Sequence, residues 1–174
     1  MEATGYPGPM ITGLVLVERG VEALAVTLAA LVPGVAEGLV GDAIVIARAP
    51  DRDIERVADA TGAILVELSA GEDPWRAAAP LARRDWLFCL SAGDVPGEGW
   101  IRAIDRFALA AAGAGLPQGR LARARSVPER LALLGEGRVR AARLRPGDLV
   151  HRGRLDDPAR RIVPVAARIL RDPL

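Results

Sequence analysis

The clearest candidates for chemistry in this sequence stand where short apolar runs end. Asp94 follows the apolar run 86–90 through Ser91, Ala92 and Gly93. A carboxylate at such a place can hold a metal ion or a ligand hydroxyl. An aspartate there can equally serve as a turn or helix-entry residue, because its side chain accepts hydrogen bonds from nearby backbone N–H groups. Both interpretations stay open on the residues alone.

Strands and helices must position such residues, and the sequence indicates where both lie. Short apolar runs predict buried strands, and the segments between them predict helices. Pro33-Gly34 should end the first helix, Asp51 or Asp53 should cap the second, Gly62 should end it, and Pro80 should kink or shorten the third. The predicted strands are 11–17, 43–47, 63–67 and 86–90, and the predicted helices are 21–32, 53–61, 74–83 and 100–112.

Strict alternation of strands and helices predicts an α/β fold, with three layers and a mostly parallel central sheet of the Rossmann-like kind. The strands are apolar almost throughout, as burial on both faces requires. Ligands bind such sheets beyond the carboxyl ends of the strands. In this chain those ends are Val17–Gly20, Ala47–Asp53, Leu68–Asp73 and Ser91–Gly97.

Residues after 115 show less regular patterns and predict a small irregular C-terminal part. We expect a strand at 119–125, a short helix at 128–134, a hairpin from 139–144 and 149–155, and a terminal helix at 162–170. The expected organisation is a tail at 1–10, an α/β core at 11–115 and a basic segment at 116–174 packed on the same domain.

Charge is distributed unevenly along the chain. Residues 1–115 hold 9 Arg and 16 acidic residues, whereas residues 116–174 hold 14 Arg and 6 acidic residues. The basic part could form a surface for phosphates, nucleic acid or anionic membrane lipid, or the two parts could pack together and neutralise each other. Its near lack of aromatic residues and of a recognition helix argues against nucleic acid.

The remaining signals concern the cellular compartment. Cys89, the single cysteine, lies inside an apolar run and is expected in the core. The first ten residues lack the pattern of a signal peptide, and no apolar run approaches the roughly 18 residues of a membrane span. We therefore expect a cytoplasmic protein.

Four segments, taken in order, resemble family 2 glycosyltransferases, which are nucleotide-diphosphosugar transferases of the GT-A fold. They are ITGLVLV, EALAVTLAALVPGVAEGLVGDAIVI, ERVADATGAILVE and LARRDWLFCLSAGDVPGEGW. This similarity covers 11–107, and GDLVHRGRLDD extends a fainter one over 117–155, on the acceptor side. The resemblance implies a GT-A core in which a carboxylate after the second strand binds the nucleotide. An Asp-X-Asp motif binds ribose and a divalent cation, and a later Glu-Asp pair supplies the base.

The sequence departs from the family at each of these points. The Asp-X-Asp falls on Ser91-Ala92-Gly93, so that no metal ligand is expected, and no acid stands in 158–170, where the base belongs. Asp156 and Asp157 precede that segment. The family positions that would bind the nucleotide sugar are Val17, Arg19, Ala47, Arg48, Arg52, Asp53, Ser91, Gly93 and Asp94.

Three functions are therefore carried forward. The first is sugar transfer from a nucleotide-diphosphosugar without a divalent metal, with Arg19, Arg48, Arg52 and the basic C-terminal part supplying positive charge for the diphosphate. The second is an inactive GT-A relative that acts as a binding or assembly partner. The third is a binder of anionic lipid or nucleic acid through its basic C-terminal part. A homo-oligomer or a partner protein could complete the site.

Overall fold

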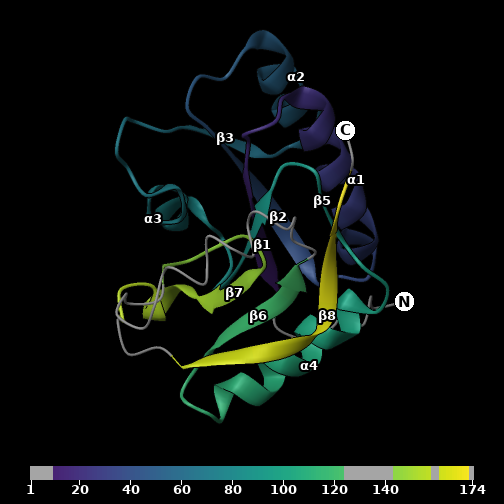
Figure 1. The fold of residues 1–174 in the computed structure, drawn as a ribbon, viewed down its shortest axis with the longest axis vertical. Helices are drawn as coiled ribbons and strands as arrows, with labels where there is room; N and C mark the ends of the chain where they lie inside the picture. The colour runs from purple at the N-terminus through teal and green to yellow at the C-terminus, as the bar shows by residue number, and fades with distance from the viewer. Residues whose placement is uncertain (1–9, 124–142, 158–160, 173–174) are drawn as a thin grey trace, which may run out of the picture.

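The computed structural model describes residues 10–123, 143–157 and 161–172. Figure 1 shows helices on both sides of a curled sheet, which confirms the predicted α/β fold. The described elements are β1 (Ile11–Leu16), α1 (Val21–Ala36), β2 (Val40–Ala47), α2 (Arg52–Thr61), β3 (Ile64–Glu67), α3 (Pro74–Ala78), η1 (Ala79–Leu81), β4 (Trp86–Ser91), β5 (Asp94–Pro96), α4 (Trp100–Ala112), β6 (Gln118–Arg123), β7 (Asp148–His151), η2 (Arg152–Arg154) and β8 (Ile162–Arg171).

These strands form one eight-stranded sheet in the order β3-β2-β1-β4-β7-β6-β8-β5. The pairs β3–β2, β2–β1 and β1–β4 are parallel, as alternation with helices requires. On the other side of β4 the sheet is mixed, because β7 is antiparallel to both β4 and β6, whereas β6 and β8 are parallel. The strands of the C-terminal part thus extend the sheet of the α/β core.

Two apolar clusters fill the space on either face of the sheet. Alternate residues of β4 point to opposite faces, so that Phe88 joins the cluster under α1, α2 and α4, while Leu87 joins the one under α3. Cys89 is fully buried in the second cluster. Helices therefore cover both faces of the parallel strands (Figure 1).

The predicted end residues of α2 and the predicted shortening of α3 at Pro80 are confirmed, and α3 ends at Ala78, before the predicted 83. Asp51 caps α2 by accepting from the N–H groups of Asp53 and Ile54 at 3.0 and 2.9 Å. Gly62 ends this helix in the left-handed conformation, with φ 69°. Next to Pro80, the α-helical hydrogen bonding of α3 gives way to the short 3₁₀ turn η1.

One predicted helix boundary and one predicted helix were wrong. Pro33 and Gly34 lie inside α1, which continues to Ala36. The helix tolerates Gly34 because it packs there against Trp100, where a Cβ would come within 2.5 Å of the indole.

The segment 162–170 is a strand, β8, and not a helix. Its buried residues Val165, Ala167 and Ile169 alternate with exposed ones.

The other C-terminal expectations had mixed outcomes. Over 119–123 the predicted strand corresponds to β6 (Gln118–Arg123), and residues 124 and 125 lie outside the described residues. Residues 143–145 form no strand, and in the described chain β7 pairs with β4 and β6. The predicted helix at 128–134, and the part of the predicted hairpin at 139–142, lie outside the described residues. Within the strand end Ser91–Gly97, residues Asp94–Pro96 form the short strand β5, which the sequence did not predict.

Candidate functional site

The carboxyl ends of β1, β2 and β4 meet at one edge of the sheet. The N–H of Val17 donates to the carbonyl of Ile46 at 2.8 Å, and the N–H of Ala92 donates to that of Leu16 at 2.8 Å. Of the residues predicted for the site, Val17, Ala47 and Ser91 therefore lie side by side. Ala47 and Ser91 are each only 2% exposed, so their side chains offer little surface to a ligand.

The predicted residues after β2 point elsewhere. Arg48 is exposed, and its guanidinium donates to the carbonyl of Ser69 beyond β3 at 3.3 Å. Asp53 forms an exposed ion pair with Arg56 on α2 at 2.9 Å. Arg52 is exposed at the start of α2. No described contact brings Arg48, Arg52 or Asp53 to the turn that follows β4.

Asp94 holds that turn together from inside the protein. Its carboxylate is fully buried and accepts from the N–H of Ser91 at 2.8 Å. The other oxygen accepts two hydrogen bonds from the guanidinium of Arg123 on β6, at 3.0 and 2.6 Å. Both oxygens thus accept hydrogen bonds from protein groups. These are the contacts expected of an aspartate that stabilises a turn.

A guanidinium lies directly over the same turn. Gly93 has φ +90°, and a Cβ placed on it would come within 2.5 Å of Nη1 of Arg19. The same nitrogen donates to the carbonyl of Asp172 at 3.0 Å, and the N–H of Asp172 donates to the carbonyl of Gly93 at 2.8 Å. The absence of a side chain at Gly93 therefore makes the room that the positive charge of Arg19 occupies.

Two further residues of the site were missed from the sequence. Thr27 of α1 is fully buried, accepts from the N–H of Gly93 at 2.8 Å and donates to the carbonyl of Ser91 at 3.4 Å. Glu18 is exposed at the end of β1 and accepts from the hydroxyl of Ser91 at 3.2 Å. A polar residue on the apolar face of α1 was the available signal for Thr27. Glu18 could have been predicted as a site residue because it lies in Val17–Gly20, one of the predicted strand ends.

The residues at this turn do not fit a divalent cation. Ser91, Ala92 and Gly93 supply no carboxylate, and Asp94 is saturated by Ser91 and Arg123. Within the described ranges, no three His, Cys, Asp or Glu side chains are grouped so that they could hold a metal ion. Asp156 and Asp157, which precede the segment expected to carry the base, form ion pairs with Arg76 and Arg154.

Several arginines of the basic part are engaged in ion pairs. Arg123 pairs with Asp94, and Arg152 with Asp85, which joins the two oppositely charged parts of the chain. Arg120 donates two hydrogen bonds to the fully buried Asp148, at 2.6 and 2.9 Å. These hydrogen bonds, aided by the charge of Asp148, raise the pKa of Arg120 and outweigh its partial burial.

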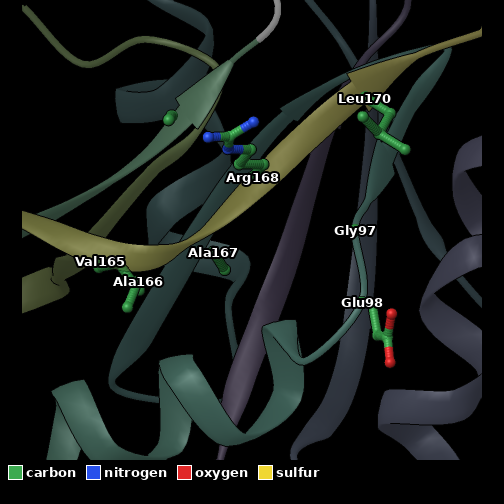
Figure 2. A pocket seen from close by; sticks show the side chains of 8 residues that line it. Gly97, Glu98, Val165, Ala166, Ala167, Arg168 and Leu170 are labelled. Atoms are coloured by element: carbon green, nitrogen blue, oxygen red, sulfur yellow. The ribbon is translucent and has the colours of Figure 1, made fainter.

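A hollow of about 470 Å³ lies between β8 and the segment that joins β5 to α4. Figure 2 shows its wall of small apolar residues on β8, with Gly97 and Glu98 across from them and Arg168 pointing away. Only Glu98 and Arg168 among its lining residues can ionise, and they point in different directions. The hollow therefore shows no converging groups for catalysis.

The described residues contain no helix that is both long enough and apolar enough to cross a membrane. No family model matches the sequence. No curated protein matches it.

Comparison with solved structures supports the fold. The chain is similar to glucosyl-3-phosphoglycerate synthase from Mycobacterium tuberculosis, which was solved in complex with phosphoglyceric acid. The TM-score is 0.55 at 16% sequence identity, and the match covers 84% of this chain and 58% of the synthase chain. The present chain thus spans less than two thirds of that enzyme. At this level of identity the similarity establishes a shared GT-A-like fold and does not extend to individual residues.

Proposed function

We propose that this chain is a glycosyltransferase-like protein that binds a nucleotide-diphosphosugar at the carboxyl edge of β1, β2 and β4 and uses arginine in place of a divalent metal. The observation that carries the proposal is the guanidinium of Arg19 above Gly93, where the family resemblance locates the end of the Asp-X-Asp motif. The fold shared with a sugar-transferring synthase supports it.

The chemistry of sugar transfer explains why a cation is needed at this place. When the glycosidic bond breaks, negative charge develops on the leaving diphosphate, and a positive group stabilises it. A guanidinium has a permanent charge and forks its hydrogen bonds to two phosphate oxygens. Arg19 is partly exposed and has one described hydrogen bond, from Nη1, so its other N–H groups can reach a ligand.

Ligand binding to the purified protein tests this proposal. Uridine, guanosine and adenosine diphosphosugars should be titrated in EDTA, with the melting temperature and calorimetric heat as readouts. A saturating donor at about 100 times its Kd should stabilise the fold by about 2.7 kcal/mol. In a chain of this size that corresponds to a rise of roughly 5–10 °C.

Variants of arginine identify the group that binds. Arg19→Ala should weaken donor binding at least about tenfold, because a charge-assisted contact is lost. Arg102→Ala, which removes an exposed arginine on α4, is the matched control and should bind as the wild type does. The proposal fails if no donor binds, if Mn²⁺ is required for binding, or if Arg19→Ala binds normally.

A non-catalytic GT-A relative is the second candidate, and burial of the turn favours it. Ser91, Ala92 and Asp94 are at most 2% exposed and offer no group that could exchange a proton with a substrate. In this case the donor would bind without being consumed. Incubation of each donor with water or with phosphoglyceric acid, the ligand of the similar synthase, decides between the two. Enzyme-dependent release of nucleoside diphosphate would exclude the non-catalytic function.

A further inference from the structure

Arg19 is held by a residue from the far end of the chain. Its Nη1 donates to the main-chain carbonyl of Asp172, which lies 153 positions away in sequence. We propose that Asp172 is a positioning residue, whose main chain orients the guanidinium of Arg19 for an anionic ligand. The inference rests on the proposed role of Arg19, and it makes the end of β8 a part of the ligand site.

The main chain of Asp172 is itself anchored at the turn. Its N–H donates to the carbonyl of Gly93 at 2.8 Å, and the antiparallel pairing of β5 with β8 sets Asp94 opposite Arg171. Figure 1 shows β8, in yellow, running to the end of the described chain alongside β5. The N–H of Asp172 thus secures the strand to the turn, while its carbonyl holds the arginine above the same turn.

Such an anchor matters because an arginine side chain is long and mobile. An unheld guanidinium samples many rotamers, and a ligand that orders it loses part of the binding free energy. The carbonyl of Asp172 uses one N–H of the group and restrains the rest before the ligand arrives. Gly93 completes the arrangement, since a Cβ there would displace Nη1.

A pair of substitutions at one position separates the main chain from the side chain. Asp172→Pro removes the N–H that binds Gly93, whereas Asp172→Ala keeps this N–H and removes only the carboxylate. The extended conformation of Arg171 in β8 is the one favoured before proline. Inorganic pyrophosphate in EDTA is the probe, because it carries the diphosphate charge without a base or a sugar.

The expected result is a difference between the two variants. Asp172→Pro should bind pyrophosphate about tenfold more weakly than the wild type, and Asp172→Ala should bind within about twofold of it. Equal affinity of Asp172→Pro and the wild type would overturn the inference. An equal loss in both variants would also overturn it, since the side chain would then be responsible.

A second measurement uses the wild type alone, in case Asp172→Pro does not fold. Pyrophosphate should slow hydrogen exchange at the amide of Asp172, because ligand binding and the anchor stabilise the same arrangement of Arg19. Unchanged exchange at saturating pyrophosphate would refute the coupling. If neither pyrophosphate nor any nucleotide sugar binds the wild type, the proposed function fails, and the role of Asp172 with it.

Discussion

Replacing Asp94 by asparagine should destabilise the fold strongly, although it changes the side chain very little in volume. Asp94 is completely buried, and Arg123, its partner, is only 15% exposed. The substitution removes the negative charge and leaves the guanidinium partly buried without a counter-charge. Breaking a buried pair in this way costs about 3–5 kcal/mol. The solvent that still reaches Arg123 places this case near the lower end, at about 3 kcal/mol.

The matched control is an aspartate–arginine pair in the same protein at its surface. Asp53 and Arg56 are joined at 2.9 Å, but their side chains are 60% and 75% exposed. Asp53→Asn should therefore cost no more than about 0.5 kcal/mol. Because the two substitutions are chemically identical, the difference between them reports burial of the pair.

Urea unfolding followed by far-ultraviolet circular dichroism measures both variants. A loss of about 3 kcal/mol should lower the urea midpoint with an unchanged slope, and the melting temperature should fall by roughly 6–12 °C. A loss below about 1 kcal/mol for Asp94→Asn, or equal losses in the two variants, would refute the reasoning. Asp94 would then not be the group that holds the turn after β4.

Two glycine substitutions test the packing at this turn and between α1 and α4, and a third serves as a control. Gly93→Ala should cost about 1–2 kcal/mol because φ is +90°, and it should also weaken donor binding by displacing Arg19. Gly62→Ala, at φ +69° with nothing within 4 Å, should cost a similar amount in urea unfolding and leave binding intact; a binding loss in both variants would contradict this assignment. Gly34→Ala should lower stability, since its Cβ would meet the buried ring of Trp100 at 2.5 Å. Overpacking by about 1–3 kcal/mol exceeds the gain of about 1 kcal/mol in helix propensity, and a raised urea midpoint would show that the site can relax.

The parallel half of the fold could be predicted because its signals are local. Short apolar runs marked β1 to β4, and Asp51 and Gly62 marked the two ends of α2. The strand β8 was missed because the alanine, arginine and leucine in 162–170 favour a helix by intrinsic propensity. The alternation of its buried and exposed residues arises from its pairing with β6 and β5, which are distant in sequence.

The candidate site was predictable only in part, for the same reason. Parallel strands bring their carboxyl ends to one edge, so the meeting of Val17, Ala47 and Ser91 followed from the strand order. The position of Arg19 depends instead on the carbonyl of Asp172 and on the open space at Gly93. Contacts of this kind between distant residues leave no periodic signal in the sequence.

The contacts around Gly93 also bear on the kind of ligand that the site can accept. In a metal-dependent site, two carboxylates and a cation together present a net charge close to zero before the ligand arrives. Here the turn has a glycine and a serine at those positions, and the charge of Asp94 is balanced by Arg123 inside the protein. The guanidinium of Arg19 and the exposed carboxylate of Glu18 are then the charged groups that the described turn offers to a ligand. The nucleoside diphosphate that we propose as ligand would offer its diphosphate to Arg19 and its ribose hydroxyls to Glu18.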